Sequence, residues 1–186
     1  KKEGENHLLR KGKICDRVPF HTSRTFRAEE GMLTYEREAY TDGGWETLYL
    51  PFEATLPKGF HLETLEDFDG ENLIFSPSEN ISANMPYILR YCEETKEQKV
   101  PLLLYSATCE ITTEEQTPDF FNGVYDTLYI ANESGYLLNK TGNAFVKAAA
   151  GSRLYPFRAF IQPTNDLRRI NIRHVVAHAS ENITTK

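Results

Sequence analysis

Hydrophobic and polar positions alternate along much of this chain, and polar turn residues interrupt the alternation about every ten residues. Leu33 and Tyr35, for example, alternate with Thr34 and Glu36. This period of two is typical of a strand with one buried face. The stretch Thr41-Asp42-Gly43-Gly44 follows as a turn, because glycine reaches positive φ without a steric cost. We therefore expect residues 31–52 to form a hairpin.

Short strands separated by polar turns are predicted over the rest of the chain at 86–92, 100–107, 109–113, 125–131, 136–138, 144–147, 155–161 and 168–177. The apolar run at 102–105 is typical of a strand buried on both faces. Tyr155, Phe157, Ala159 and Ile161 share one side of a strand by period-two spacing. Only residues 62–68 and 148–150 favour helix, and both are too short for a stable one. The pattern predicts an all-β fold with little helix, either an antiparallel β-sandwich or a barrel-like sheet.

The length of 186 residues suits one domain. We expect a single β domain over residues 8–178, a disordered lead at 1–7 and a frayed polar tail at 179–186. The chain starts at Lys1 without an initiator methionine or a signal peptide, so we expect a trimmed piece of a longer protein.

Composition narrows the function classes. With 21 basic and 27 acidic residues the net charge is −6, which argues against a nucleic-acid partner or an anionic membrane surface. No apolar stretch approaches about 20 residues, so no membrane span is expected. The three cysteines, Cys15, Cys92 and Cys109, are too few for a disulfide scaffold. A Cys92–Cys109 bond and free buried thiols both stay open.

Catalytic signatures are missing from the sequence. It contains no G-x-S-x-G, no P-loop and no dinucleotide-binding fingerprint, so we expect no catalytic residues and no enzyme. His174 and His178 have the spacing of zinc ligands on a helix. In a strand they would lie about 13 Å apart, which is too far for one ion, so ordinary surface histidines are the alternative.

Two further groups are candidate ligand sites. Asp67, Asp69 and Glu71 place hard oxygen atoms beside a glycine, the chemistry that calcium prefers, with an ordinary solvated acidic turn as the alternative. Calcium is the only cofactor that the sequence suggests. Trp45, Tyr40 and Tyr125 are candidates for stacking against sugar rings, with core packing as the alternative.

Three segments give the chain a resemblance to a known type of module. They are Leu33-Thr34-Tyr35-Glu36-Arg37, Gly44-Trp45-Glu46-Thr47-Leu48-Tyr49-Leu50-Pro51-Phe52 and Tyr155-Pro156-Phe157-Arg158-Ala159-Phe160. Together with Asn84-Met85-Pro86-Tyr87 they resemble an uncharacterised all-β module of secreted and cell-surface proteins of gut Bacteroidetes. Such modules often accompany leucine-rich repeats or immunoglobulin-like domains. The resemblance implies an extracellular or cell-surface location, and it carries over no catalytic residue.

Three functions follow as hypotheses. The first is a noncatalytic surface module that supports adhesion, assembly or display within a larger protein, with other domains of that protein or host and dietary glycans and proteins as partners. The second is a carbohydrate-binding module that uses exposed aromatic side chains. The third is a glycan hydrolase with dispersed carboxylates, which two carboxyl groups converging in one cleft would favour.

Overall fold

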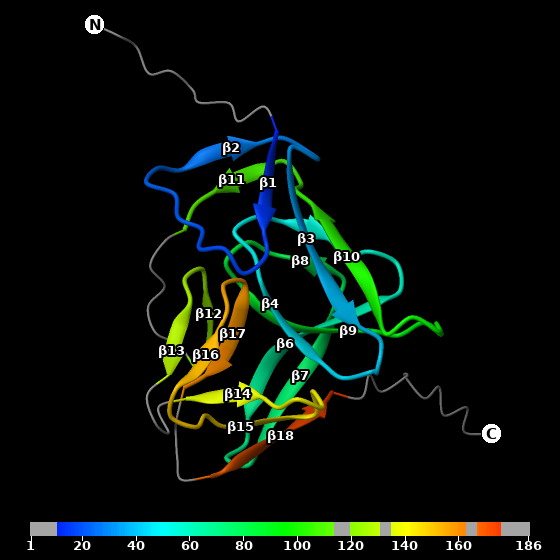
Figure 1. Ribbon diagram of the computed structural model, residues 1–186, viewed down its shortest axis with the longest axis vertical. Helices are drawn as coiled ribbons and strands as arrows, with labels where there is room; N and C mark the ends of the chain where they lie inside the picture. The colour runs from blue at the N-terminus through cyan, green and yellow to red at the C-terminus, as the bar shows by residue number, and fades with distance from the viewer. Residues whose placement is uncertain (1–10, 114–119, 131–134, 163–166, 176–186) are drawn as a thin grey trace, which may run out of the picture.

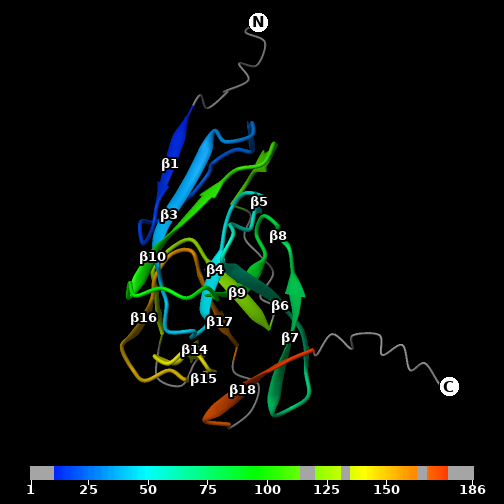
Figure 2. The same ribbon diagram turned by 90° about the vertical axis from the view of Figure 1, so that its right-hand side faces the viewer.

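The computed structural model describes residues 11–113, 120–130, 135–162 and 167–175, and every structural statement below concerns these residues (Figures 1 and 2). All the regular secondary structure among these residues is β-strand, which confirms the expected all-β class. The predicted lead at 1–7 and tail at 179–186 lie outside the described residues.

A nine-stranded sheet forms the larger part of the fold (Figure 1). In hydrogen-bonded order its strands are β12 (Phe121–Val124), β17 (Arg158–Ile161), β14 (Tyr136–Leu138), β15 (Ala144–Lys147), β18 (Arg169–His174), β7 (Asn72–Ser78), β6 (Phe60–Phe68), β9 (Pro86–Tyr91) and β4 (Glu46–Tyr49). Neighbouring strands are antiparallel except β7 and β18, which are parallel. These two strands are far apart in sequence, so no tight turn imposes the antiparallel direction on them.

Smaller sheets complete the fold. A three-stranded sheet contains β1 (Gly12–Cys15), β3 (Leu33–Tyr40) and β10 (Lys99–Tyr105), and two-stranded sheets pair β2 (Phe26–Ala28) with β11 (Cys109–Ile111), β13 (Leu128–Ile130) with β16 (Ser152–Leu154), and β5 (Ala54–Thr55) with β8 (Asn80–Ile81). In Figure 2 the three-stranded sheet lies above the strands of the large sheet. Its β1 and β3 are parallel, so the expected antiparallel arrangement holds for most pairs and fails for β1–β3 and β7–β18.

The two ends of the nine-stranded sheet approach each other, so that the sheet is nearly closed. The Tyr49 amide of β4 donates to the carbonyl of Phe157 at 3.1 Å, just before β17. The Ala159 amide of β17 donates to Oγ1 of Thr47 at 3.1 Å. We call this contact between β4 and β17 the seam. A bulge in β6 between Leu65 and Asp67 adds local bend and twist, and the result is barrel-like.

The apolar side chains form two clusters on opposite faces of the barrel wall. The inner cluster contains Leu73, Phe75, Ile88, Phe121, Tyr136, Phe145, Ala159, Ile161 and Ile170. The outer cluster lies between the wall and the three-stranded sheet, and joins Tyr35 and Leu104 to Leu48 and Leu89. Ile88 and Leu89 fall in different clusters because consecutive side chains of a strand point to opposite faces.

The predicted hairpin at 31–52 is wrong, because its two halves belong to different sheets. β3 pairs with β1 and β10, whereas β4 pairs with β9. Burial explains the separation. Side chains of β3 alternate between buried and open positions, as suits a sheet with one covered face. In β4 the consecutive residues Thr47, Leu48 and Tyr49 are all buried, which requires cover on both faces.

Three other local expectations also need correction. Residues 62–68 lie in strand β6 and not in a helix. The run at 102–105 alternates in β10, with Leu102 and Leu104 buried and Tyr105 exposed, so one face only is covered. Phe157 precedes β17 with a φ of 67°, and therefore does not continue the alternation of Ala159 and Ile161.

The Cys92–Cys109 bond is absent, and all three cysteines are free thiols. The Sγ of Cys92 donates to the carbonyl of Gly59 at 3.1 Å, next to β6. Cys109 instead pairs with Ala28 in the separate β2–β11 sheet. The two residues belong to different parts of the fold because β10 runs away from the barrel along β3.

Gly123→Ala should destabilise the protein by about 2 kcal/mol, within the usual range for overpacking a core. A Cβ at position 123 would lie 2.0 Å from the ring of Tyr49, a residue of the seam. Urea denaturation measures the loss. Gly31→Ala is the control, because its Cβ meets open space and only its φ of +73° carries a cost of about 1 kcal/mol. A Gly123→Ala loss no larger than the control would contradict the packing of Tyr49 on Gly123.

Candidate functional site

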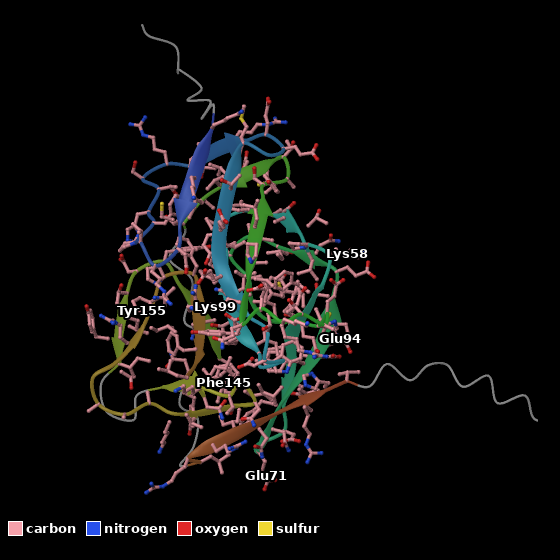
Figure 3. The ribbon with its side chains drawn as sticks, turned by 45° about the vertical axis from the view of Figure 1, so that its right-hand side comes forward. Lys58, Glu71, Glu94, Lys99, Phe145 and Tyr155 are labelled. Carbon is pink, nitrogen blue, oxygen red and sulfur yellow. The ribbon has the colours of Figure 1, made fainter. Side chains whose placement is uncertain are left out.

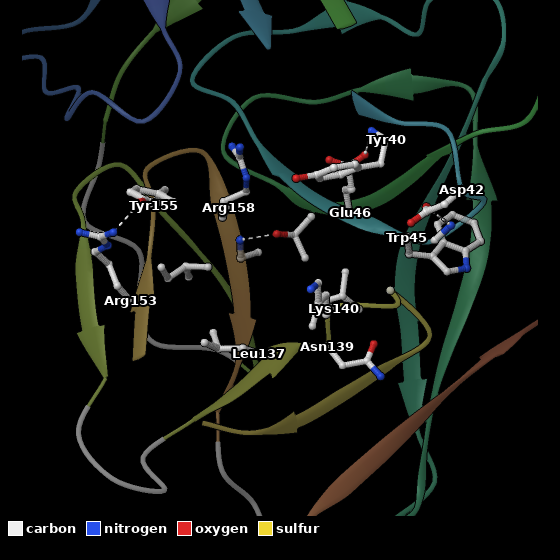
Figure 4. A pocket seen from close by; sticks show the side chains of 16 residues that line it. Tyr40, Asp42, Trp45, Glu46, Leu137, Asn139, Lys140, Arg153, Tyr155 and Arg158 are labelled. Atoms are coloured by element: carbon white, nitrogen blue, oxygen red, sulfur yellow. Dashed lines mark hydrogen bonds between the residues drawn. The ribbon is translucent and has the colours of Figure 1, made fainter. Parts of the chain in front are cut away.

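A pocket of about 270 Å³ opens at the seam, between the start of β4 and strands β14, β16 and β17 (Figure 4). We call it the seam pocket. Its lining combines aromatic, charged and amide groups with a few aliphatic side chains. The residues are Tyr40, Asp42, Gly44, Trp45, Glu46, Thr47, Leu137, Leu138, Asn139, Lys140, Gly142, Arg153, Leu154, Tyr155, Arg158 and Ala159.

The floor of the pocket is the seam itself. Thr47 of β4 and Ala159 of β17 are both buried and share the hydrogen bond that joins the strands. Arg158 lies beside them on β17 (Figure 4). The seam thus places polar groups from two strands, which are more than one hundred residues apart in sequence, at the floor of one pocket.

Arg158 is held by a charged contact to the three-stranded layer. Its Nη1 and Nη2 donate to Oδ1 and Oδ2 of Asp16 at 2.8 and 3.1 Å. The hydroxyl of Tyr35 donates to the same Oδ1 at 2.7 Å. Burial alone would raise the pKa of Asp16, but the hydrogen bonds and charge of Arg158 outweigh it and hold this pKa below its ordinary value of 3.8. The bidentate pair therefore fixes Arg158 from behind the wall.

Glu46 forms a second charged contact behind the floor. Its Oε2 accepts the Tyr40 amide at 3.0 Å, and its Oε1 lies 3.9 Å from Nη2 of Arg37. The Arg37 side chain is only 1% exposed, and its Nε and Nη1 have no hydrogen-bond partner among the residues that the structure describes. Burial raises the pKa of Glu46 above its ordinary value despite the charge of Arg37. A carboxyl group with a raised pKa in a pocket is a frequent mark of a functional site.

Two arginines surround Tyr155 at one side of the pocket. Arg153 of β16 donates from Nη2 to the Tyr155 hydroxyl at 2.5 Å (Figure 4), and its guanidinium lies 4.7 Å from the ring centroid. The guanidinium of Arg17 lies 4.7 Å from the same centroid. Guanidinium groups are attracted to aromatic faces at such distances, so this side of the pocket is strongly cationic.

A tight turn after β14 forms the other side. Oδ1 of Asn139 accepts the amide of Asn143 at 2.9 Å, and the Trp45 amide donates to the carbonyl of Gly142 at 2.9 Å. A Cβ on Gly142 would lie 2.5 Å from the backbone of Trp45, so only glycine permits this approach. Lys140 lies in this turn, opposite Arg153 (Figure 4).

The structure brings together two of the three predicted sugar-stacking residues. Tyr40 and Trp45 both line the seam pocket, and half of the Tyr40 surface is exposed. Tyr125 lies in the core, where its ring stacks on Tyr49 with a centroid distance of 4.5 Å. With 8% exposure Tyr125 offers no open face to a ligand. The notable aromatic side chain that the sequence did not single out for the site is Tyr155.

The indole ring of Trp45 is occupied by neighbouring side chains. His174 stacks on it at 5.1 Å, His61 lies at 5.7 Å, and the Arg90 guanidinium lies 5.3 Å from its centroid. Both histidines contact the buried Glu63, with His61 Nε2 at 2.9 Å and His174 Nδ1 at 2.7 Å from its two oxygens. Trp45 therefore presents its backbone and ring edge to the seam pocket more than an open face.

The candidate metal ligands lie at two places in the fold. His174 pairs with Glu63, and its suggested partner His178 lies outside the described residues. Asp67, Asp69 and Glu71 lie at the end of the β6–β7 hairpin, where Oδ1 of Asp69 accepts the amides of Glu71 and Asn72. Among the described residues no group of three or more histidine, cysteine, aspartate or glutamate side chains is arranged to hold a metal ion.

Comparison of the chain with protein-family models, with curated proteins and with solved structures finds no match. Nor do the described residues include any helix of the length and apolarity needed to cross a membrane. The seam pocket must therefore be interpreted from its own geometry.

Sequence reasoning missed the charged residues of the pocket. Arg158 lies in a segment predicted as a strand, Lys140 and Arg153 lie between predicted strands, and Glu46 lies in the predicted hairpin at 31–52. A turn such as Asn139-Lys140-Thr141-Gly142 shows that a lysine is displayed, but not what it faces. The pairing of β4 with β17 is the missing information, because it alone places these side chains around one space.

Asp16→Asn should destabilise the protein by about 3 kcal/mol at pH 7, because it leaves the half-buried Arg158 without its counter-charge. The pKa of Asp16 is depressed in the folded state. Its contribution is therefore present above the ordinary carboxyl pKa and is lost as the pH falls through the folded-state value. Urea denaturation at pH 7 and below pH 3.8 measures the difference from wild type, which should shrink in acid.

Asp126→Asn is the control for this measurement, because Asp126 is 61% exposed and pairs with the equally exposed His21. It should change stability by less than about 0.5 kcal/mol. An Asp16→Asn effect as small as that of the control at pH 7, or one that does not diminish in acid, would show that the pair does not tie the two layers together.

Proposed function

We propose that this chain is a noncatalytic binding module of a secreted or cell-surface protein, and that the seam pocket holds one sugar ring of a glycan. The single observation that carries the proposal is the lining of the pocket, which combines aromatic side chains with closely placed donors and acceptors. Sugar rings need both, since their C–H faces contact aromatic surface while their hydroxyl groups require hydrogen-bond partners.

The pocket has suitable groups for each part of a sugar. Tyr40 is half exposed and offers ring surface at the rim. Asp42 is exposed and uses one carboxylate oxygen for the Gly44 amide, which leaves acceptor capacity for a hydroxyl group. Arg153 and Lys140 provide donors from two different sides of the pocket (Figure 4).

Size favours a single ring. The volume of about 270 Å³ is just below the range of roughly 300–1,000 Å³ found for sites that enclose drug-sized ligands. An extended oligosaccharide would have to run over the rim, with one residue seated inside. Such a mode suits recognition of a branch or chain end on a larger glycan.

The wider context comes from the sequence. The resemblance to surface modules of gut Bacteroidetes supports an extracellular location and a role in adhesion or display, with other domains of the same protein and host or dietary glycans as partners. The net charge of −6 supports a partner other than nucleic acid.

A glycan hydrolase is the second candidate, because Asp42 and Glu46 line one pocket. Burial raises the pKa of Glu46, and the charge of Asp42 adds a smaller contribution in the same direction, as occurs between paired catalytic carboxyls. However, Glu46 is engaged by the Tyr40 amide and faces Arg37 behind the floor. Release of sugar from a polysaccharide panel by the wild type, abolished in Glu46→Gln, would establish this second function in place of the first.

A glycan array followed by calorimetry tests the binding proposal. Trp45 is the single tryptophan of the chain, so its fluorescence should also change when the pocket is filled. Tyr40→Ala should weaken binding of an array hit about tenfold, which corresponds to about 1.4 kcal/mol. Tyr105→Ala is the matched control, because Tyr105 is 54% exposed on β10 and does not line the pocket. Equal affinities in the two variants would refute the proposed location of the site, and an array without hits would refute sugar binding.

A further inference from the structure

The charges of the seam pocket do not balance one another. Five ionisable side chains carry charge in the lining: Asp42, Glu46, Lys140, Arg153 and Arg158. Three are basic and two are acidic, so the lining carries one excess positive charge. This excess occurs on a chain whose net charge is −6, and it therefore does not simply follow the composition.

Two of the five charges are neutralised from behind the wall. Arg158 has the bidentate pair with Asp16, and Glu46 has the nearby Arg37. Neither Asp16 nor Arg37 lines the pocket. These contacts hold the layers together, and a ligand meets Arg158 and Glu46 with their charges already compensated.

The remaining cations are open to the pocket. Lys140 is exposed and has no hydrogen bond or ion pair with any residue that the structure describes. Arg153 is also exposed, and its contacts are the hydroxyl and ring of Tyr155, which carry no compensating charge. Asp42 is the one remaining anion of the lining, so cations outnumber anions among the open groups.

Other cations surround the rim. Arg17 lies over the ring of Tyr155, and Lys99 lies over the ring of Tyr40 at 5.2 Å. Arg17 is 3.8 Å from Asp16 and Lys99 is 3.4 Å from Glu38, so both are partly compensated. They nevertheless place positive charge next to two aromatic rings of the pocket lining. Charges of one sign lining a concave surface concentrate ligands of the opposite sign.

We propose that the sugar held by the seam pocket is anionic, and that the open cations Lys140 and Arg153 attract its carboxylate or sulfate group. These two residues lie on opposite sides of the pocket (Figure 4), and Arg158 lies between them. The guanidinium of Arg153 can engage a carboxylate or sulfate through parallel N–H groups, and the ammonium of Lys140 adds a point charge. The hydroxyl groups of the ring then face Asp42 and Glu46. This inference rests on the proposed function and specifies its ligand.

Matched pairs of monosaccharides test directly whether the pocket prefers a negatively charged sugar. Glucuronic acid and galacturonic acid are compared with glucose and galactose, and galactose 6-sulfate is added as the sulfated probe. Binding to the full chain is followed by Trp45 fluorescence and by calorimetry. At least one anionic probe should bind ten or more times tighter than its neutral counterpart, and this preference should fall as salt is added. The carboxylated and sulfated probes distinguish the two sources of the anion.

Substitutions test whether Lys140 and Arg153 cause the preference for an anionic sugar. Lys140→Gln and Arg153→Gln should each reduce affinity for the preferred anionic probe about tenfold and leave affinity for its neutral counterpart nearly unchanged. Both residues are exposed, and far-UV circular dichroism checks that the variants remain folded. Lys58→Gln is the control, because it removes an equal charge at a lysine outside the lining (Figure 3). An equal loss in Lys58→Gln would mean that net charge, and not the pocket, sets the preference.

The outcomes separate the two proposals. If neutral sugars bind as tightly as their acidic counterparts, the anionic ligand is wrong and the sugar-binding function stands. If no sugar of either kind binds, both proposals fail. If anionic sugars bind but Lys140→Gln and Arg153→Gln bind them equally well, the assignment to this pocket is overturned.

Discussion

The fold depends on the seam at which β4 meets β17. The nine-stranded sheet nearly closes because its end strand β4 meets β17, the second strand from the other end, through two hydrogen bonds from the Tyr49 and Ala159 amides. Phe157 makes the approach with a φ of 67°, a region in which a bulky residue is strained by about 1–3 kcal/mol. Burial of its ring against Tyr35, at a centroid distance of 5.1 Å, offsets that strain. The seam and the outer core are thus stabilised together.

The seam also explains why a pocket exists. One of the two hydrogen bonds between β4 and β17 uses the Thr47 hydroxyl and not the backbone, so the pairing of these strands is incomplete. Side chains from β14 and β16 therefore line the space next to Thr47 and Ala159. The pairs Asp16–Arg158 and Arg37–Glu46 lie behind this space and connect it to the three-stranded layer. Buried ion pairs contribute little net stability, but removing one partner is strongly unfavourable. These pairs therefore fix the positions of the pocket groups more than they add to the total stability.

Local pattern predicted many of the strands, but it missed others, including the neighbouring strands β6 and β7 of the large sheet, and it predicted strand partners poorly. The alternation in residues 33–40 and the proline at the start of β9 were enough for those elements, because period and turn residues act within a few positions. The hairpin over 31–52 failed because a run of three buried residues in β4 requires two covering layers, which no local rule supplies. Tyr40 and Trp45 were found from their chemistry alone. Tyr125 is buried because its ring stacks on Tyr49, which is distant in sequence. Arg153 and Lys140 line one pocket only because the fold brings their segments together.

Amide hydrogen exchange at the seam tests the central claim most directly, which is that β4 and β17 hold the barrel and its pocket together. The account predicts that the Tyr49 and Ala159 amides exchange only through global unfolding, at the same free energy as the amides of the β6–β7 ladder. Exchange of these two amides at a much lower free energy, while the β6–β7 ladder stays protected, would show that the barrel opens at the seam and would contradict the account.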